Sequence, residues 1–154
     1  TAKAVSAPEQ TPTTEAPVTE TPTTEAPVTD VPTSDLGQQI ANFACQFVGN
    51  PYVWGGTSLT NGADCSGFVQ SVYKNFGYSL PRTCTPQSNA GTPVSIAALQ
   101  PGDLVFYDHG TGSCEHVGIY IGNGQIVHAS SSRTGIKISN VNYSTPFKAC
   151  RIVN

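Results

Sequence analysis

The sequence predicts an α+β domain over residues 35–154, preceded by an extended linker over residues 1–34. Three observations support this. Apolar residues recur at helical spacing in two segments of the first half of the domain. Short runs of β-branched and aromatic residues, separated by glycine turns, fill the second half. The linker region is rich in proline and threonine and has few apolar side chains that a core could bury. Helices followed by a run of antiparallel strands are typical of α+β folds.

The first 35 residues differ in composition from the rest of the 154-residue chain. They hold six of the twelve prolines and ten threonines but no aromatic residue, and the decapeptide Thr11–Glu20 repeats as Thr21–Asp30. Proline every five residues excludes a helix, and a packed core has too few apolar side chains. We expect an extended linker in the polyproline II regime, which is either a spacer from an anchor or a passive tail.

Charge divides the chain in the same way. Residues 1–35 carry one lysine against six acidic residues (net −5), while residues 36–154 have a net charge of +2. Neither value is typical of nucleic-acid binding, which requires a concentrated basic patch. No apolar run reaches the ~20 residues that span a bilayer. Because the chain has no signal peptide and does not begin with Met, we expect a processed or shortened piece of a longer protein.

The first predicted helix begins at Ser34–Asp35, two good N-cap residues, and ends at Gly49–Pro51. Tyr52–Trp54 predicts a short strand that runs into the turn Gly55–Gly56. The apolar face of the helix consists of Leu36, Ile40, Phe43, Ala44 and Phe47.

A second helix is predicted from Cys65 to Phe76, with Asp64 as its N-cap and Gly77 as its stop. A thiol on the first turn feels the positive end of the helix dipole, which favours the thiolate over the thiol. Cys65 is therefore a candidate nucleophile. The alternative is that it only begins the apolar face formed by Phe68, Val69 and Val72.

Leu80–Gln87 is predicted as a loop and Leu99–Asp103 as a turn. Five strands are predicted after this turn: Leu104–Tyr107, His116–Ile121, Gln125–Ala129, Ile136–Ser139 and Phe147–Val153.

Two of the three histidines, His116 and His128, lie on neighbouring predicted strands. With a three-residue loop, Gly122–Gly124, Gly118 faces His128, and His116 is the diagonal neighbour of His128 at ~7–8 Å or less between Cβ atoms. A two-residue turn would place the two rings on opposite faces. A cysteine, a histidine base and a third residue that orients the base satisfy the logic of a catalytic triad. His109 is interpreted as a loop residue without a role.

Several segments occur in the order and spacing of one family of enzymes. They are Pro51–Gly56, Asp64–Phe68, Leu80–Thr83, Leu99–Leu104, His116–Gly122 and His128–Ala129. On these segments, residues 36–154 resemble the NlpC/P60 family of papain-like cysteine peptidases, which cut bacterial cell-wall peptides. The resemblance implies the papain-like NlpC/P60 fold, with N-terminal helices packed on an antiparallel sheet.

The resemblance also implies a function: a secreted, cell-wall-associated endopeptidase. Its substrates would be peptidoglycan stem peptides, cut between D-γ-glutamyl and a diamino acid. Cys65 would be the nucleophile, His116 the base and His128 the orienting residue. The hydroxyl of Tyr52 and the amide of Cys65 would stabilise the oxyanion. No cofactor and no metal are implied, and we expect a monomer.

The resemblance places Asp64, Ser66 and Arg82 in the substrate pocket. The carboxylate of Asp64 would meet the free amine of an N-terminal L-Ala, and Arg82 the α-carboxylate of the γ-linked glutamate. An Asp64 without that cation would be costly to desolvate. In the alternative interpretations Asp64 is also the N-cap, Arg82 is a solvated loop charge, and Tyr52 and Trp54 are core aromatics, which we favour for Trp54.

The chain has five cysteines, so at least one thiol stays unpaired or pairs outside the chain. Cys84 stands where members of the family often carry serine, and Cys114 lies two residues before His116. One interpretation is a Cys84–Cys114 disulfide at the cleft. The other is a zinc site formed by these two cysteines and a histidine, although the C-x-x-C spacing of such sites is missing. Cys45 and Cys150 are expected to be small core residues.

Two further functions remain as alternatives. One is an amidase or acyltransferase that uses the same thiol on the same fold, and the other is a catalytically inactive module that binds the cell wall. The presence of Cys65, His116 and His128 favours an enzyme, because a binding module has no need for all three.

Overall fold

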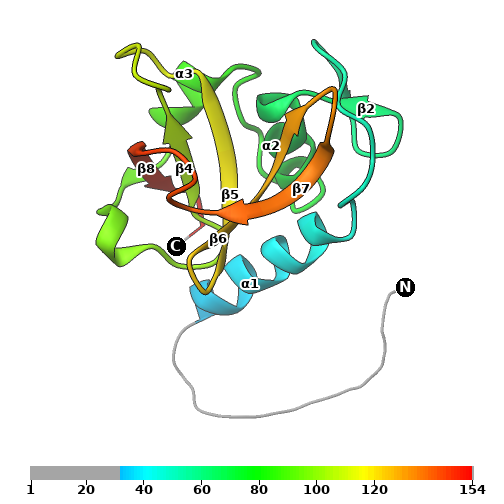
Figure 1. Ribbon diagram of the computed structural model, residues 1–154. Coiled ribbons are helices and arrows are strands. Elements are labelled where there is room, and N and C mark those ends of the chain that lie inside the picture. Colours follow the sequence, from blue (N-terminus) through cyan, green and yellow to red (C-terminus); the bar gives the residue numbers. More distant parts are fainter. Residues whose placement is uncertain (1–31, 154) are drawn as a thin grey trace. The chain divides into compact units, whose positions relative to one another are not determined.

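The computed structural model describes residues 32–153 (Figure 1). The predicted linker over residues 1–34 lies outside the described residues, apart from its last few positions. There the first helix, α1, begins earlier than predicted and spans Pro32–Cys45. Turns continue from Cys45 to Gly49, which has a φ of 98°. Within residues 32–153, no helix combines the length and apolar character needed to cross a membrane.

A six-stranded antiparallel sheet forms the main layer, in the order β3-β8-β4-β5-β6-β7. Its strands are β3 (Thr92–Pro93), β4 (Leu104–Tyr107), β5 (His116–Gly122), β6 (Gln125–Ser131), β7 (Gly135–Asn140) and β8 (Pro146–Arg151). All five strands predicted after residue 100 are present. With the helices that precede them, they confirm the α+β class.

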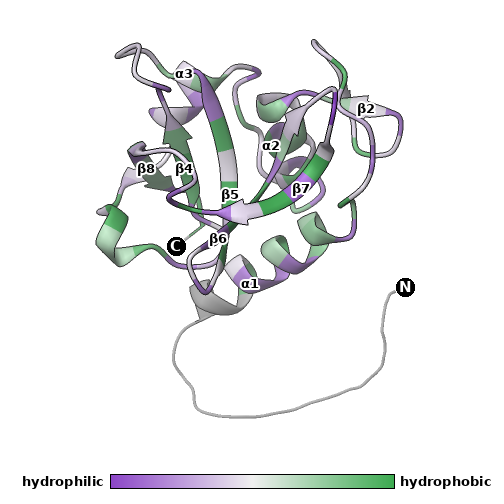
Figure 2. Ribbon diagram, in the orientation of Figure 1, coloured by the Kyte–Doolittle hydropathy of each residue, from purple (hydrophilic) through white to green (hydrophobic). Residues whose placement is uncertain are grey.

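The helix predicted at Cys65 is present as α2 (Cys65–Lys74), and it packs across β5 and β6 (Figure 1). Phe68, Val69 and Val72 are fully buried on its inner face. Figure 2 shows apolar residues recurring along the strands, and those of β5 and β6 meet the helix in one core. Burying each large aliphatic side chain contributes about 1.5–3 kcal/mol, so this layer fixes the position of α2 on the sheet.

The structure differs from the prediction in the segments around α2. Tyr52–Trp54 is not a strand, because Val53 donates its N–H to Ala63 and accepts from Gly56 in a turn. A small hairpin, β1 (Thr57–Ser58) and β2 (Gly62–Ala63), follows this turn. The predicted loop Leu80–Gln87 contains the start of a short helix, α3 (Cys84–Ser88). A single 3-10 turn, η2 (Ile96–Ala98), precedes β4.

The β5–β6 hairpin has the predicted register but reaches it differently. Asn123 and Gly124 form a two-residue turn, with φ values of 55° and 73°, and Gly122 pairs with Gln125. A register shift between Tyr120 and Gly122 then restores the pairing of Ile119 with Val127. Gly118 therefore comes opposite His128, where an added Cβ would lie 3.3 Å from the His128 Cβ. The predicted three-residue loop is wrong, yet its consequence for the two histidines holds.

Gly67 in α2 provides a test of this packing. Alanine is favoured over glycine in a helix interior by about 1 kcal/mol. A Cβ at Gly67, however, would collide with the backbone carbonyl of Gly56 and lie 2.9 Å from the Asp64 carboxylate. Overpacking costs typically about 1–3 kcal/mol. We therefore expect Gly67→Ala to lower the free energy of unfolding by about 1–2 kcal/mol, measured as a lower urea midpoint with unchanged slope.

The matched control for this substitution is Lys74→Ala at the exposed end of the same helix, which should stay within about 0.5 kcal/mol of the wild type. A Gly67→Ala protein as stable as the wild type would contradict the close approach of α2 to the Gly56 segment.

Candidate active site

Cys65 is the first residue of α2, and Asp64 is its N-cap, as predicted. The Asp64 carboxylate accepts a hydrogen bond of 2.8 Å from the Gly67 N–H, and its carbonyl accepts one of 2.8 Å from Phe68. The backbone N–H of Val117, the residue after His116, lies close enough to the Cys65 thiol to lower its pKa. The start of α2 and the start of β5 therefore meet at the thiol.

The ionisation of Cys65 is opposite to the prediction. Burial of the thiol raises its pKa, and the negative charge of Asp64 adds to this rise. The backbone N–H groups of Val117, Ser66 and Cys65 itself lower the pKa but do not outweigh burial. Burial therefore favours the protonated thiol, and a nearby base would be needed to take its proton during attack.

His116 and His128 form a hydrogen bond of 2.6 Å between His116 Nε2 and His128 Nδ1. Both rings are buried, with exposed fractions of 6% and 1%. His128 Nε2 in turn lies 2.9 Å from the hydroxyl of Ser139 on β7. These contacts leave Nδ1 of His116 as the ring nitrogen that can accept a proton from a thiol.

Ser139 was not singled out from the sequence. The β6–β7 register pairs His128 with Lys137 and Ile126 with Ser139, so Ser139 is the diagonal neighbour of His128 on the same face. The pairing argument used for the β5–β6 hairpin, applied to the β6–β7 hairpin, would predict the contact between Ser139 and His128.

Both imidazoles are neutral at physiological pH. Burial is the main cause that lowers the pKa of His116 to about 3 and that of His128 to about 4. The neighbouring ring of His128 and then that of His109 lower the pKa of His116 further, while Lys137 and His109 act on His128. His116 lies on β5, which packs against the helix that Cys65 begins, and in its neutral form it can act as a general base.

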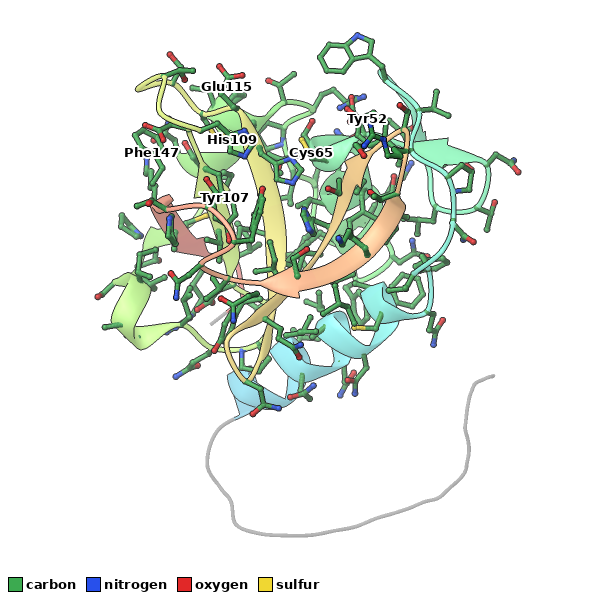
Figure 3. All side chains as sticks on the ribbon, viewed as in Figure 1. Tyr52, Cys65, Tyr107, His109, Glu115 and Phe147 are labelled. Carbon is green, nitrogen blue, oxygen red and sulfur yellow. A yellow bond between two sulfur atoms is a disulfide. The ribbon has the colours of Figure 1, made fainter. Side chains whose placement is uncertain are left out.

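Tyr52 lies on the segment before β1 and is half-buried. Burial raises the pKa of its hydroxyl, and the negative charges of Cys65 and Asp64 raise it further. The hydroxyl therefore lies near both groups and stays protonated, as a hydrogen-bond donor must. Figure 3 shows Tyr52, Cys65 and His109 at the end of the domain away from α1.

A pocket of about 490 Å³ opens beside Cys65, a size typical of ligand sites. Asp64, Ser66 and Arg82 all line it, as the resemblance implied. Arg82 holds Asp64 in a two-pronged ion pair, with both N–O distances at 3.1 Å, and also donates to Ser66 and to the Gly56 carbonyl.

Asp64 therefore has a cation partner without substrate, and its contact with a substrate amine stays a prediction. Its oxygens also accept the N–H groups of Gly55 and Gly67, and these partners hold the pKa of Asp64 below its usual value against the opposing effect of burial. The alternative of Arg82 as a solvated loop charge is wrong, because its two terminal nitrogens bind the pocket floor.

Trp54 also differs from the prediction. Its side chain was expected in the core, but it is 85% exposed and forms part of the pocket wall. Its position on the turn between α1 and β1, outside any strand, explains the difference.

The Cys84–Cys114 disulfide is confirmed, with a Cα–Cα distance of 6.0 Å, and both residues line the pocket. Because each sulfur is bonded to the other, the zinc interpretation is wrong. Cys45, Cys65 and Cys150 are free thiols; Cys150 is in the core and Cys45 is half-buried against it.

His109 does lie in a loop, but its surroundings differ from those of an ordinary loop residue. Its ring stacks on that of His116, with centroids 5.8 Å apart and an interplanar angle of 24°. Its Nε2 lies 3.2 Å from the hydroxyl of Tyr143, another residue that the sequence analysis did not single out. Both side chains therefore belong to the surroundings of the imidazole pair.

Comparison with known proteins gives consistent matches. The model of the NlpC/P60 family matches residues 49–153. The chain is 42% identical over 105 residues to a gamma-D-glutamyl-L-lysine dipeptidyl-peptidase of Bacillus cereus, covering 67% of this chain and 31% of that protein. It is 47% identical over 111 residues to a gamma-DL-glutamyl hydrolase of Bacillus subtilis, covering 71% and 26%.

Among solved structures, the NlpC/p60 domain of the peptidoglycan hydrolase SagA matches with a TM-score of 0.68 and 36% identity. The match covers 74% of this chain and 97% of that domain. The chain thus spans a whole catalytic domain of this type but less than a third of the two curated relatives.

The two buried histidines predict how stability depends on pH. Below pH 6.5 the unfolded chain protonates both histidines, whereas the folded protein does so only near pH 3–4. Stability is therefore complete above pH 6.5 and falls as the pH drops. At pH 5 the loss should be about 1–2 kcal/mol for each histidine, measured by urea unfolding at pH 7 and pH 5.

The control for this measurement is the double variant His116→Gln/His128→Gln, which should lose much less stability between the two pH values. Asp64 does not interfere, because its lowered pKa acts only at more acidic pH. Equal stability of the wild type at pH 5 and pH 7 would contradict neutral, buried imidazoles.

Proposed function

The chain belongs to the NlpC/P60 family, and on that premise we propose that it is an extracytoplasmic cysteine endopeptidase of peptidoglycan stem peptides. The bond cut is the one between D-γ-glutamyl and a diamino acid. One observation carries the proposal: the helix that begins with the Cys65 thiol packs on β5, whose neutral His116 is hydrogen-bonded to His128 of β6. The γ-glutamyl bonds in the names of two relatives support the choice of bond.

The mechanism follows from the hydrogen-bond chain. His116 Nδ1 takes the thiol proton while Cys65 Sγ attacks the γ-carbonyl carbon, and His116 holds its other proton on Nε2, toward His128 Nδ1. His128 must then carry its proton on Nε2 and donate it to Ser139. Each ring thus fixes the tautomer of the next. His128 is the orienting residue that a triad requires.

The attack creates an oxyanion, which accepts hydrogen bonds from the Cys65 amide and the Tyr52 hydroxyl. The C–N bond then breaks, and His116 returns its proton to the leaving amine. Water attacks the resulting thioester after giving a proton to His116. The products are the γ-glutamyl peptide with a free carboxyl group and the restored thiol.

The pocket binds the acyl half of the substrate. The Asp64–Arg82 pair and Ser66 form its floor, and the guanidinium, about one third exposed, attracts the α-carboxylate of the γ-linked glutamate. Because Asp64 is already paired with Arg82, a second carboxylate would strengthen the attraction for the amine of a free L-Ala. Among the described residues, Glu115 is the lining carboxylate without an ion-pair partner.

The alternatives remain distinguishable by their products. An amidase would use the same Cys65 but cleave a different bond. An acyltransferase would use it to transfer the acyl group to an acceptor other than water. An inactive wall-binding module would release nothing. The neutral base next to the nucleophile favours an enzyme over the module.

The first functional test uses L-Ala-γ-D-Glu-L-Lys with products weighed by mass spectrometry. Cys65→Ala should abolish cleavage. His128→Ala should lower kcat by about 100-fold or more with little change in KM, because His128 orients the base and lies outside the pocket. His128→Asn should retain more activity, and Ser139→Ala should lose at most about tenfold, since it removes one hydrogen bond. Cleavage by Cys65→Ala would refute the mechanism.

The second test concerns the substrate amine. Glu115 is exposed, and exposed ion pairs are worth about 0.2–1 kcal/mol. We expect the free-amine tripeptide to be cut about two- to fivefold faster than its N-acetyl form, a preference that Glu115→Gln removes. The rate on the acetylated peptide is the internal control and should not change. A preference that survives Glu115→Gln would exclude Glu115 as the partner of the amine.

A further inference from the structure

His109 and Tyr143 form an exposed pair beside the catalytic imidazoles. Besides the stack of His109 on His116, the Tyr143 ring lies 5.3 Å from His128 and 6.5 Å from His116 between centroids. Burial raises the pKa of Tyr143, and the negative charge of a Cys65 thiolate raises it further. The Tyr143 hydroxyl therefore lies near the Cys65 thiol. Neither residue lines the pocket of Asp64 and Arg82.

The chain holds His109 in place at a conformational cost. His109 has a φ of 49°, in the left-handed region that non-glycine residues rarely adopt. Asp108 fixes this turn, because its carboxylate accepts the N–H groups of Gly110 and Gly112 at 3.0 and 3.1 Å. Non-glycine residues in this region cost about 1–3 kcal/mol and cluster at functional sites.

Tyr143 is held by a second turn. Its N–H donates to the Asn140 carbonyl at 2.9 Å, and the Tyr107 hydroxyl donates to the Val141 carbonyl at 2.7 Å. The Tyr107 and Tyr143 rings pack with centroids 5.0 Å apart. Two separate turns therefore bring the imidazole and the phenol within 3.2 Å of each other, while Tyr143 remains 44% exposed.

The pair always has one hydrogen left to donate. A neutral imidazole has one N–H and a phenol has one O–H, and their mutual hydrogen bond uses one of the two. If Tyr143 donates to Nε2, the N–H on Nδ1 of His109 remains; if Nε2 donates, the Tyr143 O–H remains. In both tautomers, the pair presents a donor to the outside and suits an acceptor such as a carboxylate.

The mechanism fixes which part of a substrate reaches this pair. The leaving amine takes its proton from His116, so the amine half must lie against that ring. The acyl half occupies the pocket of Asp64 and Arg82. Of the aromatic rings that pack against His116, His109 and Tyr143 are exposed, whereas His128 and Tyr107 are buried.

We propose that His109 and Tyr143 form the leaving-group subsite and donate a hydrogen bond to the α-carboxylate of the diamino acid. This inference rests on the proposed function. It makes the pair a specificity determinant for peptides that end at the diamino acid.

The test compares three substrates that share the acyl half: L-Ala-γ-D-Glu-L-Lys, its C-terminal amide, and L-Ala-γ-D-Glu p-nitroanilide. The wild type should cut the acid faster than the amide. Tyr143→Phe and His109→Phe each keep ring packing but leave one donor on the other residue, whereas the double variant removes both donors. The double variant should lower kcat/KM on the acid about five- to twentyfold, and the single variants should lower it less. Their rates on the amide should fall less, and those on the anilide should stay within about twofold.

His109→Gln, which retains an N–H donor, should partly restore the preference for the acid. The control is Phe147→Leu, a partly exposed aromatic on β8 that lies away from Cys65 (Figure 3) and should change none of the rates. An equal fall on all three substrates would overturn the proposal, because it would show that the pair only positions His116. Unchanged rates in the double variant His109→Phe/Tyr143→Phe would overturn it as well. A wild type that cuts none of the substrates would instead refute the proposed function.

Discussion

The ion pair between Asp64 and Arg82 is the interaction on which the site depends. The Asp64 carboxylate caps α2 by accepting the Gly67 N–H, and it accepts the Gly55 N–H in the turn before β1. It also accepts hydrogen bonds from both terminal nitrogens of Arg82. The same guanidinium reaches the Gly56 carbonyl and the Ser66 hydroxyl. Three segments distant in sequence therefore meet around a single, largely buried charge. This arrangement fixes both the first turn that carries Cys65 and the floor of the adjoining pocket.

The second constraint is burial of the catalytic groups. Desolvation disfavours charge, so it raises the pKa of Cys65 and lowers those of His116 and His128. These directions favour a neutral resting site, with a protonated thiol at the start of α2 and a neutral imidazole on the neighbouring strand β5. The hydrogen-bond chain from His116 through His128 to Ser139 then determines which ring nitrogen of each histidine carries the proton. The mechanism proposed above therefore obtains its nucleophile by proton transfer during attack and not from a preformed thiolate.

Local patterns in the sequence predicted the parts that depend on neighbours in the chain. The Asp64 cap and the α2 helix follow from helical spacing. The alignment of His116 with His128 was expected from a three-residue loop, but a register shift between Tyr120 and Gly122 produces it. The Cys84–Cys114 disulfide was one of two interpretations, and the structure decides between them. Contacts between distant segments were not predictable in this way. Arg82 pairs with Asp64, Trp54 stays exposed, and Tyr143 reaches His109 because loops from different parts of the chain converge.

The central claim is that Cys65 forms a thioester with the γ-glutamyl half of the substrate. The most direct measurement is mass spectrometry of protein quenched in acid during turnover of L-Ala-γ-D-Glu p-nitroanilide. The account predicts a transient adduct with the mass of the L-Ala-γ-D-Glu acyl group, mapped to the peptide that contains Cys65. An adduct on Cys45 or Cys150, or anilide release with Cys65 unmodified throughout turnover, would contradict it.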